Sequence, residues 1–69
     1  HIMFRNVVGI TPHQYLIQAR LKEAARLLRQ SQSPLNDIAE RTGFTSQSAL
    51  GNAFKRYFQL TPGQFRNQH

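Results

Sequence analysis

The 69-residue chain contains no cysteine, and no apolar stretch in it approaches the roughly 20 residues that span a bilayer. Without cysteine, neither a disulfide framework nor a thiolate metal site is available. Nothing at the N-terminus resembles a signal peptide, which needs a charged segment followed by a short apolar core. These absences predict one small soluble domain in the cytoplasm.

Acidic residues are also scarce. Three Asp and Glu residues stand against nine Lys and Arg residues, which gives a formal net charge of +6. Such a surplus favours a polyanionic partner, with nucleic-acid phosphate as the first candidate and an anionic membrane surface as the second. Charge alone does not separate these two partners.

The residue combinations of an enzyme site are missing as well. The three histidines, His1, His13 and His69, lie at a terminus or at an expected helix start. The chain has no Ser-His-Asp set, no carboxylate pair, no metal-ligand spacing and no glycine-rich phosphate loop. The sequence therefore predicts no enzymatic activity, no metal and no cofactor.

One twelve-residue pattern occurs twice, at residues 4–15 and again at residues 54–65. Both copies have an aromatic residue, a base, two apolar residues, an apolar residue before Thr-Pro, and then Gln followed by an aromatic. Because the first copy begins near the N-terminus, the repeat indicates one complete unit preceded by the tail of another. We therefore expect the chain to be part of a larger, two-unit domain.

Proline marks the expected helix starts. Each proline follows a hydroxyl residue, as Thr11-Pro12, Ser33-Pro34 and Thr61-Pro62. Ser or Thr at the N-cap accepts a backbone hydrogen bond, and Pro at the first helical position has no N–H to leave unpaired. Gln14 and Gln64 stand three residues after the two threonines and complete capping boxes. A fourth helix is expected from Ser46, and strand patterns are absent, so the predicted fold class is all-α.

The helix expected from Pro12 to about Gln30 has an unusually wide apolar face, which indicates that it is covered from two sides. At about 100° per residue, seven apolar side chains fall within an arc of roughly 180°, namely Leu16, Ile17, Leu21, Ala24, Ala25, Leu27 and Leu28. Arg20 falls inside the same arc, where a lone charge is costly. We expect Arg20 to form an ion pair with Asp37 or Glu40; the alternative is a stem that extends to water.

Residues 33–58 have the pattern of a short helix, a tight turn and a second helix. The turn contains Gly43, a residue suited to the left-handed conformation just after a helix. Apolar residues at helical spacing give each helix one buried face, formed by Leu35, Ile38 and Ala39 in the first and by Leu50, Phe54, Tyr57 and Phe58 in the second. We expect Phe44, Phe54, Phe58 and Phe65 to be core residues. Together these features predict a helix-turn-helix.

These residues in order resemble the AraC/XylS family of bacterial transcription regulators. The matching residues are Gly9-Ile10-Thr11-Pro12, Tyr15-Leu16, Arg20-Leu21, Ala24, Leu27-Leu28, Ile38-Ala39, Gly43-Phe44, Ser46, Phe54-Lys55, Phe58, Thr61-Pro62 and Phe65-Arg66. The resemblance covers nearly the whole chain, and the segment 44–47 is most similar to the small MarA-type regulators. Gln59 departs from the pattern, because the family usually has glycine at that position.

The resemblance implies an organisation and a function. Residues 1–10 would be the end of a first recognition helix, residues 11–30 a central connecting helix, and residues 31–69 a second helix-turn-helix that reads the major groove of double-stranded DNA. The base-contacting residues carried over are Gln47, Ser48, Ala49, Gly51 and Asn52. The expected phosphate contacts are Ser33, Thr45, Ser46, Lys55, Arg56 and Arg66.

Other partners follow from the same features. The resemblance allows RNA polymerase as a partner of the parent regulator and places that regulator at the bacterial nucleoid. The alternative function is a small protein-interaction module that uses the apolar face of the central helix. A helix that binds a membrane surface is a third, weaker hypothesis. Because that face lacks a first unit to cover it, we expect self-association through Leu16, Arg20, Leu27 and residues 3–8.

Overall fold

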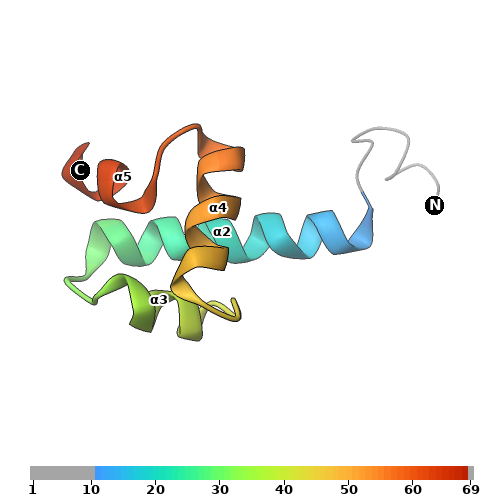
Figure 1. Cartoon of the computed structure of the whole chain (residues 1–69), viewed down its shortest axis with the longest axis horizontal. Coiled ribbons are helices and arrows are strands. Elements are labelled where there is room, and N and C mark those ends of the chain that lie inside the picture. Colours follow the sequence, from blue (N-terminus) through green and yellow to red (C-terminus); the bar gives the residue numbers. More distant parts are fainter. Residues whose placement is uncertain (1–10, 69) are drawn as a thin grey trace.

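A computed structural model describes residues 11–68, and these form four helices with no strand among them (Figure 1). The helices are α2 (Pro12–Gln30), α3 (Leu35–Arg41), α4 (Gln47–Phe58) and α5 (Pro62–Gln68). The predicted all-α fold is thus confirmed. The expectations for residues 1–10 lie outside the described residues.

Two of the predicted helix starts are confirmed in atomic detail. At α2, the Thr11 hydroxyl accepts from the Gln14 N–H and the Gln14 amide oxygen accepts from the Thr11 N–H, both at 3.1 Å. Thr61 and Gln64 repeat this arrangement at α5, at 3.1 and 3.0 Å. Both sequences therefore encode complete capping boxes, in which each partner satisfies a backbone donor of the other.

The predicted cap at Ser33 is wrong. The N-cap of α3 is Pro34, which has no side-chain hydrogen bond, and the helix begins one residue later than expected. Ser33 instead donates its N–H to the Ser31 hydroxyl at 3.3 Å and accepts from Arg41 at 3.4 Å. The following proline favours an extended conformation at Ser33, which keeps this residue outside the helix.

The turn between α3 and α4 closes with a Schellman arrangement. The Gly43 N–H donates to Glu40 O at 3.2 Å, and the Phe44 N–H donates to Ala39 O at 2.9 Å. Gly43 has φ +88°, as its predicted left-handed role requires. Thr42 is buried, and its hydroxyl donates to Ile38 O at 2.7 Å, so the polar atoms of the turn are satisfied locally.

The core lies where α3, α4 and α5 pack against the C-terminal half of α2 (Figure 1). Its buried residues come from all four helices and are Leu21, Ala24, Ala25, Leu28, Ile38, Ala39, Leu50, Phe54 and Phe65. The ring of Phe54 lies 4.5 Å from that of Phe58 and 5.4 Å from that of Phe65, measured between centroids. Phe44 is half-buried against this cluster, so all four phenylalanines take part in the core, as predicted.

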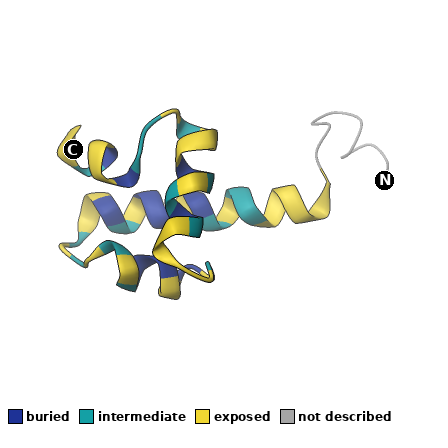
Figure 2. Ribbon diagram, in the orientation of Figure 1, coloured by how far each residue is buried: buried dark blue, intermediate teal, exposed yellow. Residues whose placement is uncertain are grey.

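The wide apolar face of α2 is only partly covered. Its N-terminal turns extend beyond the other three helices, and they are exposed or half-buried (Figure 2). Tyr15 is 56% exposed and Leu16 is 45% exposed, whereas Leu21 and Leu28 further along are buried. The described helices therefore cover α2 at one end and leave the other end accessible.

The predicted ion pair of Arg20 with Asp37 or Glu40 is also wrong. Asp37 pairs with Arg41, four residues along the same helix, at 3.5 Å. Arg20 instead donates to Gly43 O, in the turn after α3, at 3.3 Å. A carboxylate and a guanidinium one helical turn apart are already neighbours, so the local pair forms and Arg20 binds a carbonyl instead.

Candidate nucleic-acid interface

One side of α4 is polar and faces solvent. At about 100° per residue, Gln47, Ser48, Gly51, Asn52 and Lys55 fall within an arc of roughly 140°. Gln47, Ser48, Asn52 and Lys55 are exposed, and Gly51 is half-buried. The buried Leu50 and Phe54 lie outside this arc, on the side of the helix that packs into the core. Four of the five predicted base-contacting residues thus share one accessible face, which we call the polar face of α4.

Ala49 and Arg56 lie to one side of this polar face. Arg56 lines an open groove of about 620 Å³ between α4 and the N-terminal half of α2, together with Ala53, Tyr57, His13 and Ile17 among others. Ala49 is half-buried. The predicted residues therefore divide into a central group on the polar face and a flank formed by Ala49 and Arg56, of which Arg56 lies beside α2.

The N-terminal end of α4 is well defined. The hydroxyl of Ser46 accepts from the Ala49 N–H at 3.0 Å, and Thr45, Ser46 and Gln47 are exposed. The first N–H groups of a helix have no intrahelical partner and carry the positive end of the helix dipole. An anionic oxygen is favoured at such an end, which lies beside the polar face.

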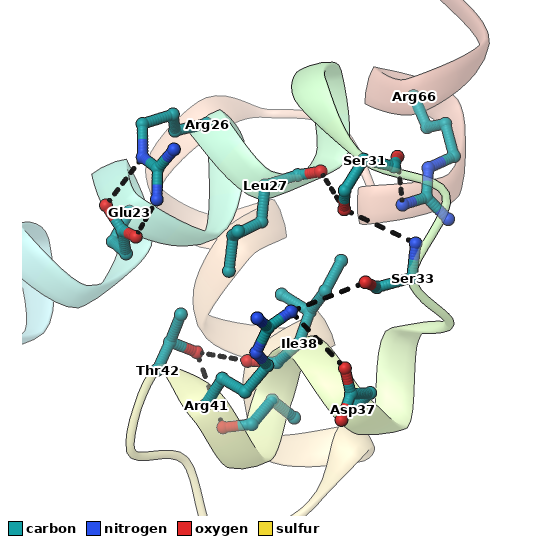
Figure 3. A network of polar contacts seen from close by, with 11 residues as sticks. Glu23, Arg26, Leu27, Ser31, Ser33, Asp37, Ile38, Arg41, Thr42 and Arg66 are labelled. Carbon is teal, nitrogen blue, oxygen red and sulfur yellow. Dashed lines mark hydrogen bonds and ion pairs between the residues drawn. The ribbon is translucent and has the colours of Figure 1, made fainter.

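The positive charge is not spread evenly over the described helices. Arg26 binds Glu23, with Nε to Oε1 at 3.0 Å, and this hydrogen bond lowers the pKa of the Glu23 carboxyl (Figure 3). Arg41 is likewise paired with Asp37. Lys55 and Arg56 are exposed and have no ion pair among the described residues. The uncompensated charge of α4 therefore lies at its C-terminal end, with Lys55 on the polar face and Arg56 on its flank.

Arg66 has a role that the sequence did not predict. Its guanidinium donates to Ser31 O at 3.2 Å (Figure 3). It also donates to Leu28 O at 3.3 Å, and together the two contacts close the carboxyl end of α2. A cation stabilises the last carbonyls of a helix. Because Arg66 and Leu28 are 38 residues apart, no local pattern signals this contact. The structure therefore favours helix capping over the predicted phosphate contact.

Within residues 11–68, no three His, Cys, Asp or Glu side chains come together as a metal site would require. Among the same residues, no helix is both long enough and apolar enough to cross a membrane.

A short helix, a glycine turn and a second helix with an exposed polar face define a helix-turn-helix unit. Residues 1–68 match a family described as a helix-turn-helix domain. The curated relatives include the probable transcriptional regulator LumQ of Photobacterium leiognathi, which is 38% identical over 96% of this chain and 27% of its own length. The multiple antibiotic resistance protein MarA of Salmonella typhimurium is 38% identical over 97% of this chain and 54% of its own length. The chain belongs to the AraC/XylS family, as the resemblance predicted.

Solved structures agree with this assignment. An AraC-type transcriptional regulator from Chromobacterium violaceum matches with a TM-score of 0.90 and 29% identity, over 96% of this chain and 59% of that one. The DNA-binding domain of AdpA, solved in complex with a target DNA, matches with a TM-score of 0.85 and 36% identity, over 96% and 60% of the two chains. The chain spans about a quarter of the length of several curated relatives.

Proposed function

We propose that this chain binds double-stranded DNA in a sequence-specific manner, as part of a transcription regulator, with α4 in the major groove. The observation that carries the proposal is the polar face of α4, which stands clear of the core next to a capped helix N-terminus. A major groove about 12 Å wide admits one α-helix. The solved complex of the related AdpA domain with DNA supports the same kind of partner.

The base readers divide by chemistry. Gln47 and Asn52 each end in an amide that can bond bidentately to adenine N6 and N7, and both are exposed. Ser48 lies between them on the polar face, and its hydroxyl can form a hydrogen bond with either a donor or an acceptor on a base edge. Gly51 leaves room for the backbone to approach the DNA, since no side chain or other part of the described fold lies within 4 Å of the position a Cβ would take, its chain neighbours and the adjoining helix backbone apart. Ala49 offers a methyl group to thymine from the flank.

Phosphate contacts come from the rim of the polar face. We assign them to Thr45 and Ser46 at the N-terminal end of α4, and to Lys55 and Arg56 near its C-terminal end. Ser33 is left out because both its N–H and its hydroxyl are engaged, and Arg66 because its guanidinium already binds two carbonyls. The Ser46 hydroxyl accepts from Ala49 and can still donate its own proton to a phosphate. These contacts fix the position of α4 on the duplex without reading its sequence.

The test begins with a preferred site selected from a randomised pool of duplexes. Anisotropy titrations against this site and a scrambled duplex are then repeated at several salt concentrations. Each neutralised phosphate contributes a slope of about −0.9 to log K against log salt, so Lys55→Gln should flatten the slope by about 0.9. Gln47→Ala should weaken binding to the preferred site by about 1–3 kcal/mol and leave the scrambled duplex nearly unaffected.

Arg29→Gln is the matched control, since it removes one exposed positive charge from the far end of α2. It should change neither the slope nor the discrimination between duplexes. If wild-type binding is independent of salt, or if no site is enriched from the pool, the proposal is wrong. Equal effects of Gln47→Ala and Lys55→Gln on both duplexes would overturn the division into readers and phosphate contacts.

For the parent regulator, we propose a place in the cytoplasm at the nucleoid, with RNA polymerase as a further partner. Support comes from the family alone, in which several relatives are described as transcriptional regulators. A pull-down would test the proposed partner: the full-length protein, bound to its selected DNA site, should recover RNA polymerase. Protein lacking residues 11–68 is the control. No recovery above that control would contradict it.

A second candidate function is association through the exposed N-terminal half of α2. The observation that favours it is the exposure of Leu16 and Tyr57, at 45% and 39%. Of the other residues expected in this contact, Leu27 packs against the core and Arg20 binds the turn. Sedimentation equilibrium should show a dimer that Leu16→Lys dissociates, while Lys22→Ala, an exposed neighbour, should not. A monomer at all concentrations would contradict self-association, and a protein-interaction module would then require a different partner.

A further inference from the structure

Arg20 of α2 lies against the turn of the helix-turn-helix. Its Nη1 donates to Gly43 O at 3.3 Å. A Cβ placed on Gly43 would lie only 3.0 Å from Arg20 Nε and 3.1 Å from Arg20 Cζ. The guanidinium therefore covers the Cα side of Gly43 and also binds its carbonyl. A Cβ at this position would press against the guanidinium more tightly than an ordinary van der Waals contact.

Gly43 stands between α3 and the N-cap of α4 at Ser46. The N–H groups of Gly43 and Phe44 bind the end of α3, so the turn is fixed to α3 by its own hydrogen bonds. Its carbonyl, in contrast, is bound by a side chain of α2. Residues 45–48 are exposed, and apolar contacts to the core resume only at Leu50. Arg20 is thus the hydrogen-bonded link between α2 and the start of α4 among the described residues.

We propose that Arg20 is a positioning residue for sequence reading, which sets how the first turn of α4 stands relative to α2. The inference rests on the proposed function, because that turn carries Gln47 and Ser48. Hydrogen bonds to base edges weaken steeply when their angles are wrong. Contacts to phosphates fix orientation without reading sequence and tolerate more displacement. Loss of the Arg20 contact should therefore reduce discrimination between sites more than overall affinity.

The first experiment compares Arg20→Met with Lys22→Met. Both variants lose one positive charge from α2, but Lys22 is exposed and has no hydrogen bond to the turn. The measured quantity is the ratio of the dissociation constants for the scrambled duplex and the selected site. Arg20→Met should lower this ratio by about five- to tenfold, the effect of losing one hydrogen bond, and Lys22→Met should leave it unchanged. Equal ratios for the two variants would overturn the inference.

The second experiment needs no DNA and therefore separates this inference from the proposed function. In the free protein, Arg20→Met should shift the backbone amide signals of residues 43–48, whereas Lys22→Met should leave them in place. Unchanged signals in Arg20→Met would show that Arg20 does not hold the turn. If the wild-type chain fails to select a site while these signals do shift, the proposed function fails and the Arg20–Gly43 link stands without a reading role.

A double-mutant cycle tests the contact between Arg20 and Gly43 through stability alone. Gly43→Ala is strained by its positive φ in any background, but its Cβ meets the guanidinium only when Arg20 is present. Gly43→Ala should therefore lower the midpoint of urea unfolding further in the wild type than in Arg20→Ala. Additive effects of the two substitutions would contradict the contact and with it the inference.

Discussion

Gln59 has a backbone conformation that its residue type does not favour. It ends α4 with φ 68°, in the left-handed region, where an L-residue is disfavoured by roughly 1–2 kcal/mol. Its side chain donates to Arg56 O at 3.2 Å, which offsets part of this cost. The resemblance placed glycine here, so the departure noticed in the sequence corresponds to a strained residue in the structure.

We therefore expect Gln59→Gly to raise the free energy of unfolding by about 0.5–1 kcal/mol. Relief of the backbone strain stabilises the folded state, and the greater freedom of glycine in the unfolded chain offsets part of that gain. Urea unfolding followed by circular dichroism measures this change. Gln32→Gly, in the connection between α2 and α3 and without a positive φ, is the control and should be destabilising. A loss of stability in Gln59→Gly would show that the side-chain hydrogen bond outweighs the strain.

Gly51 presents the opposite case, since it lies in the interior of α4. Glycine costs a helix about 0.5–1 kcal/mol relative to alanine, and a Cβ at Gly51 would enter open space. We expect Gly51→Ala to stabilise the fold by about that amount in the same unfolding assay. Gly63→Ala, in the first turn of α5 and equally open, should give a smaller gain because helix ends contribute less. No gain at Gly51 would contradict this account.

At the scale of whole elements, α2 depends on a distant residue for its C-terminal end. Arg66 of α5 binds two carbonyls there, while α2's own last-turn base, Arg29, is exposed. Arg66→Met keeps most of the apolar stem and removes the charge. We expect it to lower the free energy of unfolding by roughly 1–2 kcal/mol, after allowing for partial solvent exposure.

The control for that prediction is Arg29→Met, which should change stability by less than about 0.5 kcal/mol. Amide hydrogen exchange gives a second measurement, because protection in the last turn of α2 should fall in Arg66→Met alone. If both variants lose the same stability, the contact between α5 and α2 contributes nothing beyond a general charge effect.

For the whole molecule, stability depends on one small core. Phe54 is fully buried in the core cluster and contacts the rings of both Phe58 and Phe65, so it joins α4 to α5. Replacing a buried Phe with Ala costs about 3–5 kcal/mol, a large share of the 5–15 kcal/mol that holds a typical domain. Phe54→Ala should therefore abolish or severely weaken cooperative thermal unfolding.

Tyr57→Ala on the same helix provides the matched comparison, because Tyr57 is 39% exposed. It should lower the melting temperature only moderately and keep a single cooperative transition. A fully cooperative transition in Phe54→Ala, at a temperature close to that of Tyr57→Ala, would mean that the core does not depend on this ring.

Much of the fold was determined by short-range features of the sequence. The capping boxes at Thr11 and Thr61, the cap at Ser46 and the left-handed Gly43 all act within three or four residues, so local pattern was sufficient to predict them. The apolar spacing on α4 likewise predicted its buried side, and the remaining side is its polar face. The exposure of Gln47, Ser48, Asn52 and Lys55 followed from that periodicity.

The long-range contacts were decided only by the tertiary structure. Arg20 was expected to bind a carboxylate and binds Gly43 O, 23 residues away; Arg66 was expected at a phosphate and closes α2, 38 residues away. A long, flexible guanidinium can reach several acceptors, and helical periodicity gives its direction but not its partner. The choice depends on how the packed helices place carbonyls and competing cations such as Arg41, which only the assembled core determines.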